Sequence, residues 1–401
     1  MPWRELSIMD QREEFVRLAL VRGANRSELC RRFGISRDKG YKWLARYREE
    51  GRAGLGDRSR RPHSSPQRTA AAVEAEVLRL RAESNNAWGG RKIAKVLSAS
   101  LATAPVASTI TAILRRNGKL EEHSSEHPGP YQRFERDEPN DLWQMDFKGH
   151  FAIGRGRCHP LTVLDDHSRY ALGLEACGNE QDMTARQCLI EIFRRYGLPL
   201  AMLMDNGSPW GDSGGERYTK FTVWLMRLGI GISHGRPYHP QTQGKDERFH
   251  RSLKAEVLNR KSFADLVQCQ QAFDRWRPVY NRERPHEALG LAVPADRYRM
   301  SPRPYPEALP AIEYGPGDIV RKVDISSRIS FKNRVRRIGK AFCGELIALR
   351  PTLQDGIFAV HYCAHRIGTI DLIGDTPEAG EQHSVLSTSY PQAKQQQQEC
   401  E

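Results

Sequence analysis

The segment WQMDFKG, residues 143–149, places Asp146 within a short apolar run, Leu142–Phe147, that is typical of a β-strand. A second apolar run, 200–204, leads directly into Asp205 and a tight Asn-Gly turn. Open α/β sheets collect functional side chains at the ends of their strands. The two segments therefore indicate an α/β domain with an acidic site at one edge of its sheet.

A third acid, Glu247, lies in the polar segment GKDERFHRSLKAE, within an expected helix over residues 244–258. Helical spacing puts a carboxylate and groups that can hold phosphates on one side of this helix: Glu247, His250, Arg251 and Lys254. The candidate DNA contacts of the segment are Lys245, Arg248, Arg251 and Lys254. The same spacing also fits an exposed helix with ordinary ion pairs.

Three carboxylates can hold two Mg²⁺ ions, because Mg²⁺ prefers hard oxygen ligands. Two such ions, about 3.5–4 Å apart, can clamp the attacking and leaving oxygens of a phosphoryl displacement. We therefore expect Asp146, Asp205 and Glu247 to be both metal ligands and catalytic residues, with two Mg²⁺ ions for which Mn²⁺ can substitute. An isolated Asp is more often a cap or a surface charge, so the prediction depends on all three acids together.

Short apolar runs alternate with helical patterns throughout residues 141–300, the layout of an α/β domain. The further strands are expected at 161–164, 170–175 and 230–233, and the helices at 183–196 and 221–228. Residues 301–375 change to short runs with Gly turns, which predicts a small β-barrel-like domain. Residues 376–401 include a Gln run and are expected to be a disordered tail.

The charge of the chain points to an anionic partner, usually nucleic acid. The formal net charge is +13 and the pI is about 9.5. Residues 1–70 hold 17 Lys and Arg against 9 Asp and Glu, so the excess is concentrated at the N-terminus. That concentration favours a DNA-binding N-terminal region over a merely soluble basic protein.

Residues 1–50 read as a helix-turn-helix domain, in which Gly34 makes the turn and Ser36 caps the last helix. The N-terminal residues of that helix would enter the major groove, so the candidate DNA contacts are Arg37, Lys39 and Lys42. A plain three-helix bundle with a solvated basic face is the alternative.

Two linkers and a second helical region follow. Residues 51–69 form a basic linker in which Arg58, Arg60 and Arg61 are candidate phosphate or minor-groove contacts, although a solvated tether fits the composition equally well. Residues 70–120 read as a second helix-turn-helix-like domain, and residues 121–140 as a further linker.

The cysteines and the apolar runs bear on location. The eight cysteines form no CxxC pair, which suggests thiols in a reducing cytosol. The N-terminus has no apolar signal region, and no run is long enough to span a bilayer. We expect a cytoplasmic protein, associated with the nucleoid when bound to DNA and with no membrane partner.

Five motifs together resemble the catalytic core of insertion-sequence transposases of the retroviral-integrase superfamily, the DDE enzymes with an RNase H-like fold: WQMDFKG, DDHSRY (165–170), DNGSPW, GRPYHPQTQGKDERFHRSLKAE (235–256) and NRERPHEALG (281–290). The resemblance is strong over 141–300 and looser over the rest of the chain. It implies an RNase H-like core with a mixed sheet, between all-α helix-turn-helix units and a small all-β domain.

The resemblance also implies the roles of individual residues. Asp146 and Asp205 match the two metal-binding Asp residues of the family, Glu247 matches the Glu of the final core helix, and Lys254 matches a basic residue that contacts DNA. Asp165 and Asp166 match a motif that we interpret as structural, with Arg169 a possible partner.

Two features depart from the family pattern. The gap between Asp205 and Glu247 is longer than usual, and we assign the extra length to a loop at 211–215. Asp246 also precedes Glu247, where a neutral residue is common. Neighbours on a helix point about 100° apart, so only one can face the metals; the family match selects Glu247.

The sequence therefore predicts a transposase. It would bind the terminal inverted repeats of an insertion sequence, cut the strand with a metal-activated water and join the freed 3′-OH to target DNA, as a homodimer or a higher assembly on DNA. Two alternatives stay open: a catalytically silent DNA-binding regulator derived from a transposase, and a nuclease that cuts without joining.

Overall fold

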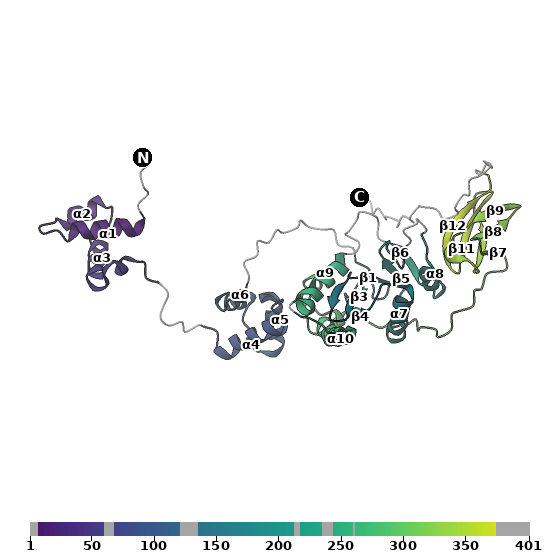
Figure 1. The fold of residues 1–401 in the computed structure, drawn as a ribbon, viewed down its shortest axis with the longest axis horizontal. Helices are drawn as coiled ribbons and strands as arrows, with labels where there is room; N and C mark the ends of the chain where they lie inside the picture. The colour runs from purple at the N-terminus through teal and green to yellow at the C-terminus, as the bar shows by residue number, and fades with distance from the viewer. Residues whose placement is uncertain are drawn as a thin grey trace, which may run out of the picture. The chain divides into compact units, whose positions relative to one another are not determined.

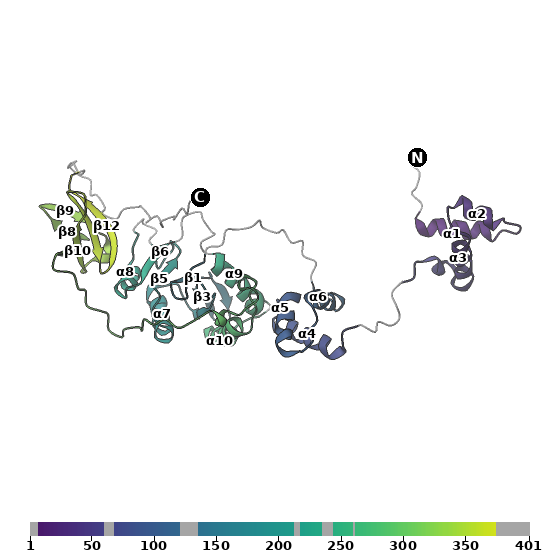
Figure 2. The same ribbon diagram turned by 180° about the vertical axis from the view of Figure 1, so that it is seen from behind.

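The computed structural model describes residues 7–59, 68–120, 135–211, 217–234, 244–259 and 261–373. The chain divides into two compact units, Met1–Arg68 and Thr69–Glu401, whose elements are drawn in Figures 1 and 2. The predictions for Arg60, Arg61, most of the 211–215 loop and the 376–401 tail lie outside the described residues.

The N-terminal unit is helical, as predicted: α1 (Ile8–Ala19), α2 (Arg26–Arg32) and α3 (Arg37–Glu50). Ser36 caps α3 by accepting a hydrogen bond from the backbone N–H of Lys39, and Gly34 takes the left-handed conformation in the turn before it (φ +64°). Phe15, Trp43 and their apolar neighbours form the small core. The helix-turn-helix geometry of this unit follows from these local signals.

The second unit begins with three more helices: α4 (Ala71–Glu83), α5 (Gly90–Ser100) and α6 (Ala107–Arg116). Their core contains Trp88, Ile93 and Ile113. At Gly90 the helices α5 and α6 approach so closely that an added Cβ would lie 2.5 Å from the carbonyl oxygen of Ala107. Only glycine allows this approach.

A mixed sheet forms the centre of the second unit, in the order β2-β3-β1-β5-β6, with β4 also paired to β3. Strands β3 and β4 are antiparallel to their neighbours, whereas β1, β5 and β6 run parallel. The strands are β1 (Leu142–Phe147), β2 (Phe151–Ile153), β3 (Gly156–Asp165), β4 (Ala171–Cys177), β5 (Ala201–Met204) and β6 (Gly231–His234). This is the predicted α/β core, with β2 as an added short strand.

Helices cover both faces of this sheet. Helices α7 (Asp182–Tyr196) and α8 (Lys220–Arg227) pack on the face that carries Trp143 and Met145. Helices α9 (Gly244–Leu253), which continues as a π-helical turn (Lys254–Leu258), and α10 (Leu266–Arg282) pack on the opposite face. Helix α10, whose N-terminus is capped by the Asp265 side chain, was not among the helices expected from the sequence.

The C-terminal part is all-β, as predicted, with a four-stranded sheet in the order β12-β11-β10-β7 and a β8-β9 hairpin. The strands are β7 (Ile319–Lys322), β8 (Arg328–Phe331), β9 (Arg334–Arg337), β10 (Leu346–Pro351), β11 (Ile357–Tyr362) and β12 (His365–Asp371). Val223 and Met226 of α8 share an apolar cluster with this part, so α8 packs on both neighbours. No described helix has the length and apolar content needed to cross a membrane.

Candidate active site

Asp146 lies near the end of β1, on the sheet face covered by α9. Its cross-strand neighbour is Thr162 of β3, whose hydroxyl donates a hydrogen bond to the Asp146 carbonyl oxygen at 3.0 Å. The Nε2 atom of His250 on α9 lies 2.9 Å from the same hydroxyl, and its Nδ1 atom lies 3.9 Å from the Asp146 carboxylate. Two strands and one helix thus converge at this carboxylate.

The charge environment of Asp146 is strongly negative. Burial raises the pKa of Asp146 to about 7, and repulsion from Asp205, Glu180 and Glu247 adds to the increase. Both other predicted catalytic acids therefore act on the Asp146 charge. A carboxylate held in this way gains from a bound cation, because the cation offsets both the burial and the repulsion.

Asp205 lies directly after β5 and shapes the turn that follows it. Its Oδ1 atom accepts hydrogen bonds from the backbone N–H of Gly207 at 3.0 Å and from the Trp210 indole N–H. The Trp210 ring stacks on Phe147, with centroids 5.3 Å apart. The Asn-Gly turn thereby ties the end of β5 to the end of β1.

Helix α9 turns an apolar side to the sheet and a polar side to solvent. Phe249 and Leu253 are buried, and Glu247 is exposed in the first turn. Burial lowers the pKa of His250 to about 4, with a contribution from the Lys148 charge, so its imidazole is neutral near pH 7. The predicted phosphate-holding face therefore includes one residue, His250, that is mainly packed against the sheet.

The three acids influence one another without forming a finished ligand set. Within the parts of the chain that the structure describes, no group of three or more His, Cys, Asp or Glu side chains could hold a metal ion as placed. The assignment of Asp146, Asp205 and Glu247 as ligands stays a prediction. The Oδ1 atom of Asp205 is held in its turn by the Gly207 N–H, and Glu247 is exposed.

The second acidic motif is a hydrogen-bonded network, in line with the structural role proposed for it. Asp165 accepts backbone N–H bonds from Asn140 and Ser168, each at 2.7 Å. Asp166 accepts from the side chains of Gln144 at 2.6 Å and Lys245 at 2.5 Å. The possible partner Arg169 contacts the backbone carbonyl of Asp166 instead and pairs with Glu135 at 2.9 Å.

The predicted DNA contacts differ in their exposure. Most of them are exposed: Arg37, Lys39, Lys42, Arg58, Arg248, Arg251 and Lys254. Arg58 pairs with Glu50, and Lys245 is half-buried in its pair with Asp166. A DNA contact by Lys245 would require that pair to open. All of these DNA contacts remain predictions.

Two residues of the site were missed from the sequence. Glu180, before α7, adds to the negative field at Asp146 and lies 2.8 Å from the Nδ1 atom of His159. Lys148 lies near Lys254, since burial and the Lys254 charge lower its pKa. Glu180 belongs to none of the quoted motifs, and Lys148 belongs to WQMDFKG but was given no role, so only the folded chain reveals their part in the site.

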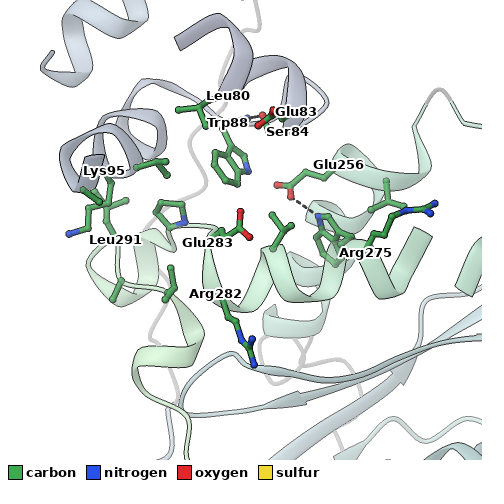
Figure 3. A pocket seen from close by; sticks show the side chains of 18 of the residues that line it. Leu80, Glu83, Ser84, Trp88, Lys95, Glu256, Arg275, Arg282, Glu283 and Leu291 are labelled. Carbon is green, nitrogen blue, oxygen red and sulfur yellow. Dashed lines mark hydrogen bonds between the residues drawn. The ribbon is translucent and has the colours of Figure 1, made fainter. Parts of the chain in front are cut away.

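A cavity of about 740 Å³ lies elsewhere in the second unit, between the α4–α5 region and α10. Figure 3 shows Leu80 and Trp88 on one side of it and Glu256 and Glu283 on the other. The Glu256 carboxylate accepts a hydrogen bond from the Trp276 indole at 2.8 Å. None of the three predicted catalytic acids lines this cavity.

Comparison with protein families finds matches to the helical N-terminal part, the central core and the C-terminal β part of the chain. The matched families are a helix-turn-helix domain (residues 11–63), a homeodomain-like domain (39–114), two integrase core domains (136–240 and 228–294) and the C-terminal domain of the IS481 family of transposases (318–378). The fold and these matches define a protein with an integrase core between helix-turn-helix units and a C-terminal β domain. The chain is therefore similar to insertion-sequence transposases and carries the integrase core domain.

Curated relatives of the chain include proteins of bacterial insertion elements. The chain is 28% identical over 182 residues to an uncharacterized 39.2 kDa protein of insertion element IS476 from Xanthomonas euvesicatoria, covering 45% of this chain and 49% of that protein. It is 25% identical to the transposase of insertion sequence IS904 from Lactococcus lactis, covering 41% of this chain and 64% of that one. The matches thus span about half to two thirds of these relatives.

Solved structures with similarity to the chain include retroviral integrases. One is the HTLV-2 integrase catalytic core domain in complex with magnesium, with 15% identity and a TM-score of 0.32, covering 41% of this chain and 99% of that one. Another is a simian T-cell lymphotropic virus intasome in complex with the B56 gamma subunit of PP2A, with 15% identity and a TM-score of 0.38, covering 71% and 91%.

Proposed function

We propose that the chain is a DDE-type polynucleotidyl transferase that binds the terminal inverted repeats of an insertion sequence, cuts the DNA strand at their ends and joins it to target DNA. The observation that carries the proposal is the position of Asp146. Its carboxyl lies near the end of β1, where Asp205 and Glu247 both repel its charge. Three acids from separate segments thus act on one charge at the end of β1, which supports a shared acidic site in an integrase core.

The residues at this edge fit a pair of divalent cations. Asp146, Asp205 and Glu247 offer hard oxygen ligands, and the burial of Asp146 among other acids leaves negative charge without a counter-ion. When bound, two Mg²⁺ or Mn²⁺ ions would supply a Lewis acid and an activated water at this position.

The chain's own side chains do the remaining work. Arg251, exposed on α9, and Lys254, exposed at the start of the π-helical turn, would hold phosphates beside the acids. His250, neutral and bonded to Thr162, fixes α9 against β3 and so sets the position of Glu247 one turn away. Most of the rate would come from alignment and charge neutralisation.

DNA recognition is assigned to the N-terminal helices. The exposed side chains of Arg37, Lys39 and Lys42 lie in the first turns of α3, the helix that a helix-turn-helix places in the major groove. Two element ends must be joined, so we include a homodimer or higher assembly on DNA in the proposal. We also propose that the protein is located in the cytoplasm, at the nucleoid when it is bound to DNA.

The test uses the full chain and labelled DNA that carries the terminal repeats. Asp146→Asn, Asp205→Asn and Glu247→Gln should each abolish cleavage and strand transfer while binding to terminal DNA stays near the wild-type level. The matched control is Asp355→Asn, an exposed acid of the β10–β11 turn, which should keep full activity. Strand transfer at the wild-type rate by any of the three variants would refute the assignment. A wild-type chain that binds ends but never cuts them would instead be a regulator.

A further inference from the structure

Asp246, next to the predicted ligand Glu247, is a buried carboxyl group without a partner. It is 1% exposed, and neither of its carboxylate oxygens has a hydrogen-bond partner in the part of the chain that the structure describes. Glu247 is exposed. The two adjacent acids of α9 therefore face different environments: Asp246 faces the protein interior and Glu247 faces solvent.

Among the described residues, the nearest cation is already paired with another acid. The ammonium group of Lys245 is bonded to Asp166, at 2.5 Å from its carboxylate and 3.1 Å from its carbonyl oxygen. The Gln144 amide N–H₂ also donates to Asp166, and its own Oε1 atom is buried without a partner. The side chains of Gln144 and Asp146 point to the same face of β1, the face that α9 covers. Oxygen acceptors thus gather here without enough donors.

A hard divalent cation is the group that satisfies several oxygen acceptors at once. His250 lies one turn after Asp246 on the same side of α9, and its Nδ1 atom is 3.9 Å from the Asp146 carboxylate, so Asp246 faces the acidic edge of the sheet. Helical spacing agrees with the burial of Asp246, because Phe249 and Leu253, three and seven residues later, are buried on the same side of α9.

We propose that Asp246 is a further carboxylate ligand of the metal centre, which binds from the buried side the ion that Asp146 binds, while Glu247 closes the centre from the solvent side. The inference rests on the proposed function. It adds a fourth carboxylate to the three that the family resemblance supplies, and it gives the unusual acid before Glu247 a role.

Mn²⁺ binding to the full chain, measured by isothermal titration calorimetry without DNA, tests the inference apart from catalysis. Asp246→Asn should weaken Mn²⁺ binding by about 10-fold or more, the range found when groups around a metal are removed. Asp355→Asn is the matched control and should bind Mn²⁺ like the wild type. Unchanged Mn²⁺ affinity in Asp246→Asn would overturn the inference.

Thermal unfolding supplies a second measurement, in case Asp246→Asn folds poorly. Asp246→Val should unfold at a higher temperature than the wild type without metal, because an apolar side chain fits a buried position that lacks donors. Its melting temperature should then rise less than that of the wild type when Mn²⁺ is added. An equal rise would contradict a ligand role.

The outcomes also separate the inference from the proposed function. Normal Mn²⁺ binding by Asp246→Asn, together with lost binding by Asp146→Asn, would reject Asp246 as a ligand and keep the three-acid site. Normal Mn²⁺ binding by Asp146→Asn would reject the site itself.

Discussion

Replacing Arg284 with Ala should strongly destabilise the second unit, because Arg284 neutralises a buried carboxylate. Its guanidinium pairs with Glu256 at 2.8 Å, and the two side chains are only 7% and 3% exposed. It also donates to the Ser252 hydroxyl at 2.8 Å and lies over the Tyr280 ring at 5.6 Å. These contacts join the end of α10 to the π-helical turn after α9, next to the proposed site.

The expected loss follows from what remains after the substitution. Glu256 would keep one donor, the Trp276 indole N–H at 2.8 Å, but its buried charge would lose the guanidinium that pairs with it. Removing one partner of a buried pair costs about 3–5 kcal/mol. For a unit of this size that lowers the melting temperature by about 6 °C or more.

Differential scanning calorimetry of the full chain measures the change, with Arg299→Ala as the matched control. Arg299 pairs with Glu138 at 2.7 Å, but the two side chains are 76% and 62% exposed, so that pair should contribute about 0–1 kcal/mol. The double replacement of Arg284 and Glu256 by Met should recover most of the lost stability. A fall for Arg284→Ala no larger than that for Arg299→Ala would refute the reasoning.

Two further predictions concern pH and DNA. Burial lowers the pKa of His286 to about 3, and the Arg284 charge adds to the shift. Between pH 6.5, near the ordinary pKa of histidine, and pH 3, His286 therefore binds a proton in the unfolded chain but not in the folded chain. The free energy of unfolding should therefore fall as the pH drops from about 6.5 towards 3. Melting curves of His286→Gln should show a smaller fall over the same range. An identical pH profile for the variant and the wild type would contradict the prediction. Arg37→Ala should weaken binding to terminal DNA, and it should lower the slope of log affinity against log salt concentration by about one if Arg37 contacts a phosphate. Fluorescence anisotropy measures both quantities, with Arg366→Ala as the exposed control. An unchanged affinity and slope would exclude the contact.

The strands and helices that carry the acids could be predicted because their signals are local. β1 begins and ends at the predicted residues, and Ser36 caps α3 through its own side chain, as its position before the helix indicated. Helix α10 was missed, although Cys269, Phe273 and Tyr280 recur at helical spacing and are buried. That signal was present in the sequence and could have been used.

How deeply each side chain of the candidate site is buried could not be predicted from the sequence. Helical spacing puts Glu247 and His250 on one side of a helix, but it does not say how that side is tilted against a sheet. The structure leaves Glu247 in solvent and packs His250 against Thr162. Glu180 reaches Asp146 only because β3, β4 and the start of α7 bring distant parts of the chain together. Such convergence depends on tertiary packing, which spacing along the chain does not encode.

The cavity beside Trp88 makes the protein open to chemical control. The Trp88 indole N–H has no hydrogen-bond partner among the described residues, and the wall opposite includes Val257 and Val279. A small apolar compound with one acceptor atom would match this lining, and any compound that binds only the folded chain stabilises it by mass action. Occupancy of this space would hold helices α4 and α5 against α10 without touching any of the three predicted catalytic acids.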